Sequence, residues 1–238
     1  LTGGADIFSG RGIIREGEPV GSFFGYVHLG TWGTAEESEA AKYLKKPGDI
    51  KYQDTNNDGV INQTDRVIIG KGIPDGFGTL LNTFRYRRFD LTLDLQFMYG
   101  NDVVYGSEHS AEDRQGIANS FKTVLNAWTP ENQNTSIAQW RPLSAGYNTN
   151  EDSRRVKDGS FLRGRNLLLA YTFSPEITQR LRLNRLRLYA SMQNFFLKTN
   201  YPGYDPEVST SGGTFDQGVA LYDYPKPKVF MVGLNIGL

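Results

Sequence analysis

The sequence predicts an all-β fold, in which long antiparallel strands form a segment of a transmembrane β-barrel. Three observations predict it: apolar and polar residues alternate strictly in several stretches, these stretches are long, and short and long connections alternate between them. The mean hydropathy of −0.47 agrees with this fold, because only every second residue of a barrel strand faces lipid.

The clearest strand is Phe89–Tyr99, where an apolar or aromatic residue occupies every odd position. The even positions hold Asp90, Thr92, Asp94, Gln96 and Met98. A helix would scatter the carboxylates around its circumference, so the period of two predicts a strand. Alternation is weaker in Phe77–Tyr86, and only Arg87 and Arg88 separate the two stretches, which predicts a hairpin.

Three further stretches alternate, namely Phe161–Phe173, Asn184–Phe196 and Val229–Leu238. In the least regular one, we expect one face to hold Leu162, Leu168 and Ala170, and the other to hold Arg163, Arg165 and Tyr171. The side chains expected to face lipid are Leu91, Leu93, Leu95, Leu186, Leu188, Val232, Leu234 and Ile236. Those expected to face the barrel lumen are Asp90, Asp94, Gln96, Arg187 and Gln193.

The lengths of the connections between strands predict on which side of the membrane each connection lies. Outer-membrane barrels have short periplasmic turns and long extracellular loops. The Arg87 turn, the Ser174–Leu183 turn and Leu238 are therefore expected in the periplasm, and residues 1–76, 100–159 and 198–225 outside the cell. Residues 1–76 then form an extracellular loop region, and residues 77–238 contain the barrel strands with their extracellular loops. Five strands are too few to close a barrel, for which about eight is the practical minimum, so we expect a larger barrel. A soluble β-sandwich with long strands fits the alternation equally well.

One segment matches the pattern of a calcium-binding loop. Residues 54–65 place Gly59 at position 6, where the sharp turn requires glycine. The ligand positions 1, 3, 5, 7, 9 and 12 fall on Asp54, Asn56, Asp58, Val60 (through its backbone carbonyl), Asn62 and Asp65. Oxygen-only ligands suit a hard cation, so we expect structural calcium. The alternatives are an Asx- and Gly-rich turn without an ion, and a dockerin half-repeat, whose second copy is not found in the sequence.

Composition and motifs argue against other functions. The 238 residues include 26 Lys and Arg and 26 Asp and Glu, so the basic excess of a nucleic-acid-binding protein is missing. Zero cysteines exclude a thiol nucleophile and cysteine-based metal sites. No stretch of about 18 apolar residues predicts a membrane helix. No catalytic motif is found, and Asp90 and Asp94 lie about 13 Å apart along their strand, too far for a glycosidase pair. We expect no enzymatic activity.

Several motifs together resemble the SusC/RagA family of TonB-linked outer-membrane transporters. They occur in the family's order and span nearly the whole chain: Glu18–Val27, Pro47–Asp54, Asp65–Gly70, Gln96–Asp102, Asp158–Arg163, Leu186–Asn194, Tyr201–Glu207 and Val232–Asn235. One departure is Leu238, since family members usually end on an aromatic residue.

The resemblance implies that the chain supplies the last five strands of a 22-stranded barrel in the outer membrane of a Gram-negative bacterium. The whole transporter would import glycan or peptide fragments, with a SusD-like surface lipoprotein as its lid. It would draw energy from TonB, through a plug domain that precedes the barrel in the family and is missing from this sequence. The alternative is a secreted, calcium-stabilised β-sandwich that binds carbohydrate.

Overall fold

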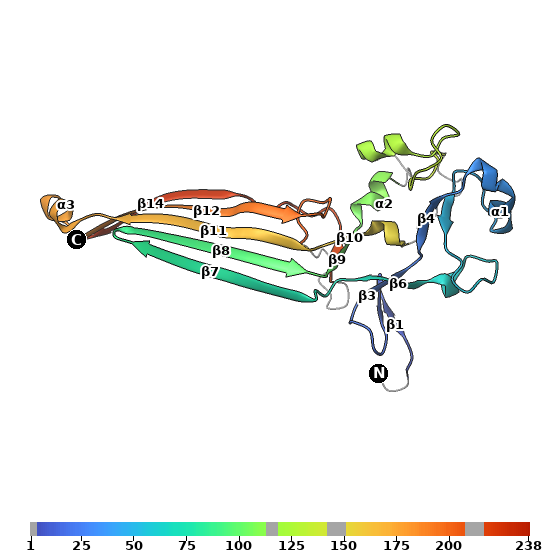
Figure 1. Ribbon diagram of the computed structural model, residues 1–238, viewed down its shortest axis with the longest axis horizontal. Coiled ribbons are helices and arrows are strands. Elements are labelled where there is room, and N and C mark those ends of the chain that lie inside the picture. The colour runs from blue at the N-terminus through green and yellow to red at the C-terminus, as the bar shows by residue number, and fades with distance from the viewer. Residues whose placement is uncertain (1–3, 113–118, 142–150, 208–216) are drawn as a thin grey trace. The chain divides into compact units, whose positions relative to one another are not determined.

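The computed structural model describes residues 4–112, 119–141, 151–207 and 217–238 (Figure 1). Parts of the predicted loops 100–159 and 198–225 lie outside these residues. The chain divides into two compact units. The sheet unit comprises residues 74–100, 159–206 and 224–238, and the connecting unit comprises residues 1–73, 101–158 and 207–223.

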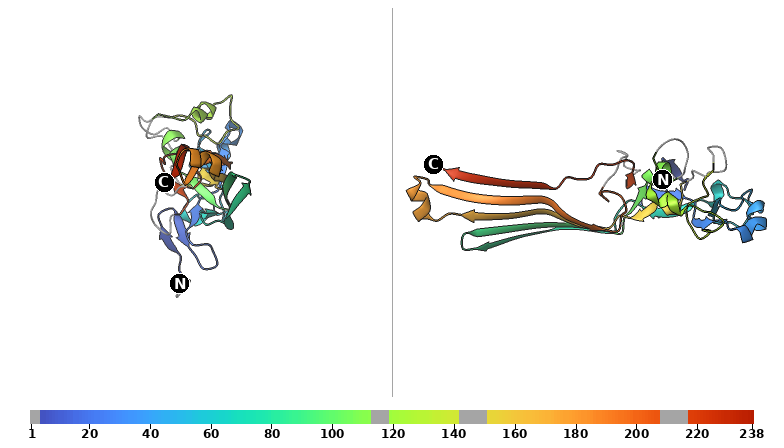
Figure 2. Two further views of the ribbon diagram at one scale, coloured as in Figure 1. Left: turned by 90° about the vertical axis from the view of Figure 1, so that its left-hand side faces the viewer. Right: turned by 90° about the horizontal axis from the view of Figure 1, so that it is seen from above.

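The sheet unit is a single antiparallel sheet of five long strands. In spatial order these are β14 (Val229–Gly237), β12 (Arg185–Thr199), β11 (Phe161–Thr172), β8 (Phe89–Tyr99) and β7 (Gly76–Tyr86). Helix α3 (Pro175–Arg180) lies in the turn between β11 and β12. The strands of this sheet lie side by side in one layer (Figure 2). Every predicted strand is confirmed, with ends shifted by at most three residues.

Cross-strand pairing fixes the two faces of the sheet. Leu91 pairs with Phe84 on β7 and with Leu169 on β11, and Leu188 pairs with Leu234. Because directly paired residues share a face, the eight leucine, valine and isoleucine side chains predicted to face lipid all lie on one face, here called the apolar face. Asp90, Asp94, Gln96, Arg187 and Gln193 lie on the opposite, polar face. The predicted separation into two sets is confirmed.

The face assignment within β11 was wrong. The register shifts between Gly164 and Asn166, which leaves Arg165 as an extra residue relative to β8. A bulge of this kind reverses the alternation beyond it. As a result, Tyr171 lies on the apolar face, opposite Phe89, while Ala170 lies on the polar face, opposite Asp90. Leu168 likewise lies on the polar face, although Leu162 is on the apolar one.

The connecting unit contains short strands and helical turns. A four-stranded sheet orders β1 (Ile7–Ser9), β2 (Gly12–Ile14), β3 (Ser22–Gly25) and β6 (Val67–Lys71). β4 (His28–Thr31) pairs with β5 (Ile50–Tyr52), and β9 (Asp102–Tyr105) lies between β10 (Val156–Asp158) and β13 (Val219–Ala220). The helices are α1 (Glu37–Lys42) and α2 (Ser107–Glu112), with 3₁₀ turns at Thr34–Glu36, Gln63–Asp65, Lys122–Asn126 and Ser153–Arg155.

Two small apolar clusters hold the connecting unit together. One joins Phe23, Val104 and Val219 from three separate parts of the chain. The other joins Tyr26, Ile50, Tyr52 and Ala138. The long connections between the barrel strands are thus folded in themselves. No helix in the described ranges is both long enough and apolar enough to cross a membrane.

Candidate functional site

The predicted calcium loop, residues 54–65, joins β5 to β6 and is held by its own polar side chains. The Asp54 carboxylate accepts hydrogen bonds from the backbone N–H groups of Asp58 at 3.2 Å and Gly59 at 2.8 Å. Gly59 has φ +82°, a backbone conformation that residues with a Cβ rarely adopt. The sequence-predicted turn at Gly59 is therefore present.

The second half of the loop is organised by Asp65. Its carboxylate is fully buried and accepts hydrogen bonds from the backbone N–H groups of Thr55 at 2.8 Å and Asn62 at 2.9 Å. Asn62 in turn caps the 3₁₀ turn by accepting from Thr64 N–H. Burial of Asp65 disfavours its charge, but the backbone hydrogen bonds outweigh burial and hold the pKa of this carboxyl below its usual value.

The loop has the donor chemistry that calcium requires. Its side-chain and carbonyl oxygens are hard ligands, and they occur at the spacing of a calcium loop. In the described residues, however, no three His, Cys, Asp or Glu side chains converge as a metal cluster. Asn56 donates instead to Asp58 at 2.9 Å, within a network of Asx-type turns. The residues predicted to bind calcium thus share one folded loop, and calcium binding stays a prediction.

A buried polar cluster of the connecting unit was missed in the sequence. Asp152 is almost fully buried and accepts a hydrogen bond from the Tyr52 hydroxyl at 3.2 Å. Burial raises the pKa of Tyr52, and the nearby Asp152 carboxylate adds to the effect. Arg155 is also buried. These residues lie in stretches without apolar alternation, and no local pattern indicates that they meet.

The polar face of the sheet contains a cross-strand charge cluster. Asp90 on β8 accepts from Arg85 on β7 at 2.8 Å and lies 3.4 Å from Arg187 on β12. Asp94 and Ser191 each carry a buried side-chain oxygen without a hydrogen-bond partner among the described residues. The face is not uniformly polar, because Phe77 and Leu81 on β7 also lie on it.

The apolar face is exposed to an unusual degree. Val232 is 78% exposed, Phe230 70% and Phe84 58%. Leaving such side chains in water is unfavourable by roughly 1.5–3 kcal/mol each, and contiguous apolar surfaces of this kind mark sites of protein or membrane contact. A β-sandwich would bury this face against a second sheet, so the sandwich interpretation does not fit these exposures.

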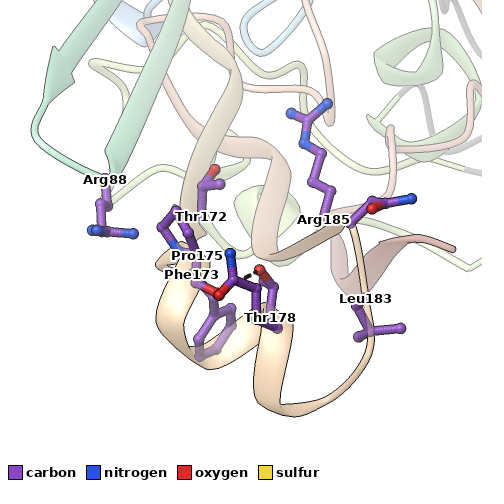
Figure 3. Close-up of a pocket in the computed structure, with 9 residues that line it drawn as sticks. Arg88, Thr172, Phe173, Pro175, Thr178, Leu183 and Arg185 are labelled. Atoms are coloured by element: carbon purple, nitrogen blue, oxygen red, sulfur yellow. Dashed lines mark hydrogen bonds between the residues drawn. The ribbon is translucent and has the colours of Figure 1, made fainter.

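The two turns at one end of the sheet border a cavity of about 460 Å³ (Figure 3). Arg88 lines it from the β7–β8 turn, and the other lining residues come from the β11–β12 connection. They are Thr172, Phe173, Pro175, Thr178, Gln179, Leu183, Asn184 and Arg185. None is acidic, so both charged side chains of the cavity wall are arginines.

Comparison with curated proteins finds relatives that are all TonB-dependent receptors. No family model matches the chain. It is 34% identical over 232 residues to TonB-dependent receptor P3 of Formosa agariphila, a match that covers 94% of this chain and 23% of the relative. It is 28% identical over 192 residues to TonB-dependent receptor SusC of Bacteroides thetaiotaomicron, covering 80% of this chain and 18% of SusC.

Solved structures share the fold. The RagAB peptide importer in its open-open state superposes with a TM-score of 0.78 and 22% identity, covering 100% of this chain and 25% of the matched chain. The closed-closed state gives a TM-score of 0.73. The chain therefore spans about a quarter or less of the length of the relatives it matches.

Proposed function

The chain is homologous to the barrel portion of TonB-dependent receptors of the SusC/RagA type, and from this premise we propose that it forms part of the membrane-spanning barrel of an outer-membrane importer. The observation that carries the proposal is the exposed apolar face of the five-stranded sheet. Lipid would cover this face, and the polar face would line the lumen.

The sheet would be completed by other strands of the same receptor. β7 and β14 are its edges, and neither pairs with a further strand among the described residues. Open edges are not tolerated in lipid, because their backbone N–H and C=O groups would remain without partners. We therefore propose upstream barrel strands as neighbours, a plug domain that engages TonB, and an outer-membrane location in a Gram-negative bacterium.

The proposed cargo is a glycan or peptide fragment, captured together with a SusD-like lipoprotein lid. The similar RagAB structures support the peptide alternative, because they are described as a peptide importer. The connecting unit would supply the extracellular surface for the lid and cargo. We propose no enzymatic role for the chain.

We also propose that residues 54–65 bind calcium as a structural ion. The support is the oxygen-only donor set at calcium-loop spacing and the left-handed Gly59 turn. The ion would fix the loop between β5 and β6. No transport step is assigned to it.

The test of the barrel proposal is the dependence of folding on a lipid-like environment. The 238-residue chain expressed alone should aggregate in aqueous buffer, because its apolar face and both sheet edges remain uncovered. The longer receptor that contains it should fold in detergent and migrate as a heat-modifiable barrel. A stable, folded monomer of the 238-residue chain in buffer without detergent contradicts the proposal.

A further inference from the structure

The end of the sheet that carries the two short turns, here called the turn end, has a row of aromatic side chains on the apolar face. The Phe89 and Tyr171 rings pack at a tilt with their centroids 4.8 Å apart, and Tyr171 packs edge-on against Phe173 at 5.1 Å. Tyr86 pairs directly with Phe89 across the hairpin. Aromatic side chains of barrels gather where acyl chains meet headgroups, so this row marks the level of a membrane interface.

Arginines lie immediately beyond this row. The Arg87 guanidinium lies over the Tyr86 ring, 5.4 Å from its centroid. Arg88, Arg180 and Arg182 are exposed in the same two turns. By contrast, Arg85 and Arg187, farther along the strands, both pair with Asp90.

Little negative charge balances the turn-end arginines. Glu176 is the one acidic residue between Phe173 and Arg187 in the sequence, and it interacts with Ser174 and Arg88. Within the described residues, no ion pair engages Arg87, Arg180 or Arg182. The cavity between the turns also lacks an acidic side chain. An anion at this end would therefore meet unneutralised positive charge.

The same turns expose apolar side chains beside the arginines. Leu181 is 55% exposed and Ile177 is 41% exposed. Basic side chains next to exposed apolar ones are typical of elements that lie in the headgroup region of a membrane. A free anion would make no favourable contact with these apolar side chains. A phospholipid, by contrast, offers a phosphate to the arginines and acyl chains to the apolar groups.

We propose that the turn end binds the phosphate of an anionic phospholipid, with Arg87 and Arg88 contributed by one turn and Arg180 and Arg182 by the other. The Tyr86 ring supports the Arg87 guanidinium from the apolar side, and Leu181 and Ile177 contact the acyl region. This inference rests on the proposed barrel function, which places the apolar face in lipid and the short turns at the inner leaflet.

The experiment measures lipid binding to the longer receptor in detergent by native mass spectrometry. Phosphatidylglycerol should bind more tightly than phosphatidylethanolamine. Each basic side chain near an anionic lipid contributes a factor of about five. The variant with Arg87→Gln, Arg88→Gln, Arg180→Gln and Arg182→Gln should therefore lose affinity for phosphatidylglycerol by about fivefold if one of the four contacts the lipid, and by up to roughly 600-fold if all four do. Replacement of the same four residues by Lys should retain most of it.

A control removes two positive charges from the other end of the same sheet. The double variant Lys198→Gln and Lys228→Gln should keep the preference for phosphatidylglycerol, since both residues are exposed but distant in sequence from the turns. Heat-modifiability on gels checks that every variant is a folded barrel. A receptor that never shows it contradicts the proposed function, whatever lipid is added.

Three results overturn the lipid inference itself. The first is a folded receptor with equal affinity for the two lipids. The second is full displacement of phosphatidylglycerol by millimolar inorganic phosphate, which identifies a free-anion site. The third is a glutamine variant that keeps its phosphatidylglycerol affinity but loses import in cells, which shows that the four arginines act on something other than this lipid.

Discussion

At the scale of single residues, the loop 54–65 combines side chains with different tasks. Asp65 is buried and binds two backbone N–H groups. Asp58 is exposed, and its carboxylate is bonded within the loop. Asp54 likewise accepts hydrogen bonds from two backbone N–H groups. The loop therefore contains two acids that its fold already requires, and an exposed one, Asp58, whose charge an ion would stabilise.

Calcium dependence tests the proposed ion ligands. Asp54→Ala combined with Asp58→Ala should abolish the increase in thermal stability that calcium gives, because two charged oxygen ligands are lost. The measurement is the Tm of the receptor with calcium and with a chelator. The double variant Glu37→Ala and Glu39→Ala removes the same charge from α1 and should leave the calcium response intact. A wild-type Tm that is equal with and without calcium contradicts the ion proposal.

Acid sensitivity tests the structural role of Asp65. Because its pKa is lowered by folding, Asp65 stabilises the loop fully above the unfolded pKa of about 3.9, and this contribution is lost as pH falls through the folded pKa. Asp65→Asn should destabilise the loop by about 2 kcal/mol at neutral pH and flatten its response below pH 4. Amide hydrogen exchange of residues 54–65, corrected for intrinsic rates, measures both effects.

The exposed Asp58 provides the control for this experiment. Asp58→Asn should leave the acid response of the loop nearly unchanged, because the exposed Asp58 carboxylate accepts one backbone N–H, that of Val60, whereas the buried Asp65 carboxylate accepts two. If Asp65→Asn and wild type lose protection identically on acidification, the assigned role of Asp65 is wrong.

At the scale of elements, period-two alternation alone placed the five strands and, in four of them, the faces. The exception is β11, where Arg165 adds a residue and reverses the alternation. The sequence offers little signal for this bulge, since bulged and regular strands contain the same residue types. Which residue is left unpaired depends on the hydrogen-bonding partners β8 and β12.

A charge introduced on β8 tests the face assignment. Leu93→Arg places a charge on the apolar face and should destabilise the barrel by about 2–4 kcal/mol if the site lies near the bilayer midplane. Thr92→Arg, one residue away on the polar face, should cost far less. Urea unfolding of the receptor in lipid vesicles gives both values. The reverse ranking of the two variants means that the faces have been exchanged.

Deletion of Arg165 tests the bulge. Without the extra residue, β11 would pair regularly with β8, and either Leu162 or Tyr171 would be forced from the apolar to the polar face. We expect the deletion to prevent heat-modifiable folding, whereas Arg165→Ala, which keeps the residue count, should fold normally. Normal folding of the deletion variant would falsify the assignment of Arg165 as the extra residue.

At the scale of the whole molecule, the chain contains two units whose stability has different origins. The connecting unit has its own apolar clusters, whereas the sheet unit exposes its apolar face. We expect lipid to stabilise the second far more than the first. Transfer of the receptor from detergent to vesicles should increase amide protection in β12 and β14, and leave that of β3 and β9 nearly unchanged. Equal changes in both units contradict this separation.

The sequence by itself determined the all-β class, the position of the long strands, the two sets of side chains and the calcium-like spacing of residues 54–65. These properties depend on residues a few positions apart in the sequence, so they can be recognised from local sequence patterns. The tertiary structure decided the bulge at Arg165, the folding of the long connections into small sheets, and the burial of Asp152 and Asp65. These features depend on backbone and side-chain partners from distant parts of the chain. Asp152 shows the difference: its partner Tyr52 is a hundred residues away, and only the folded chain brings the two together.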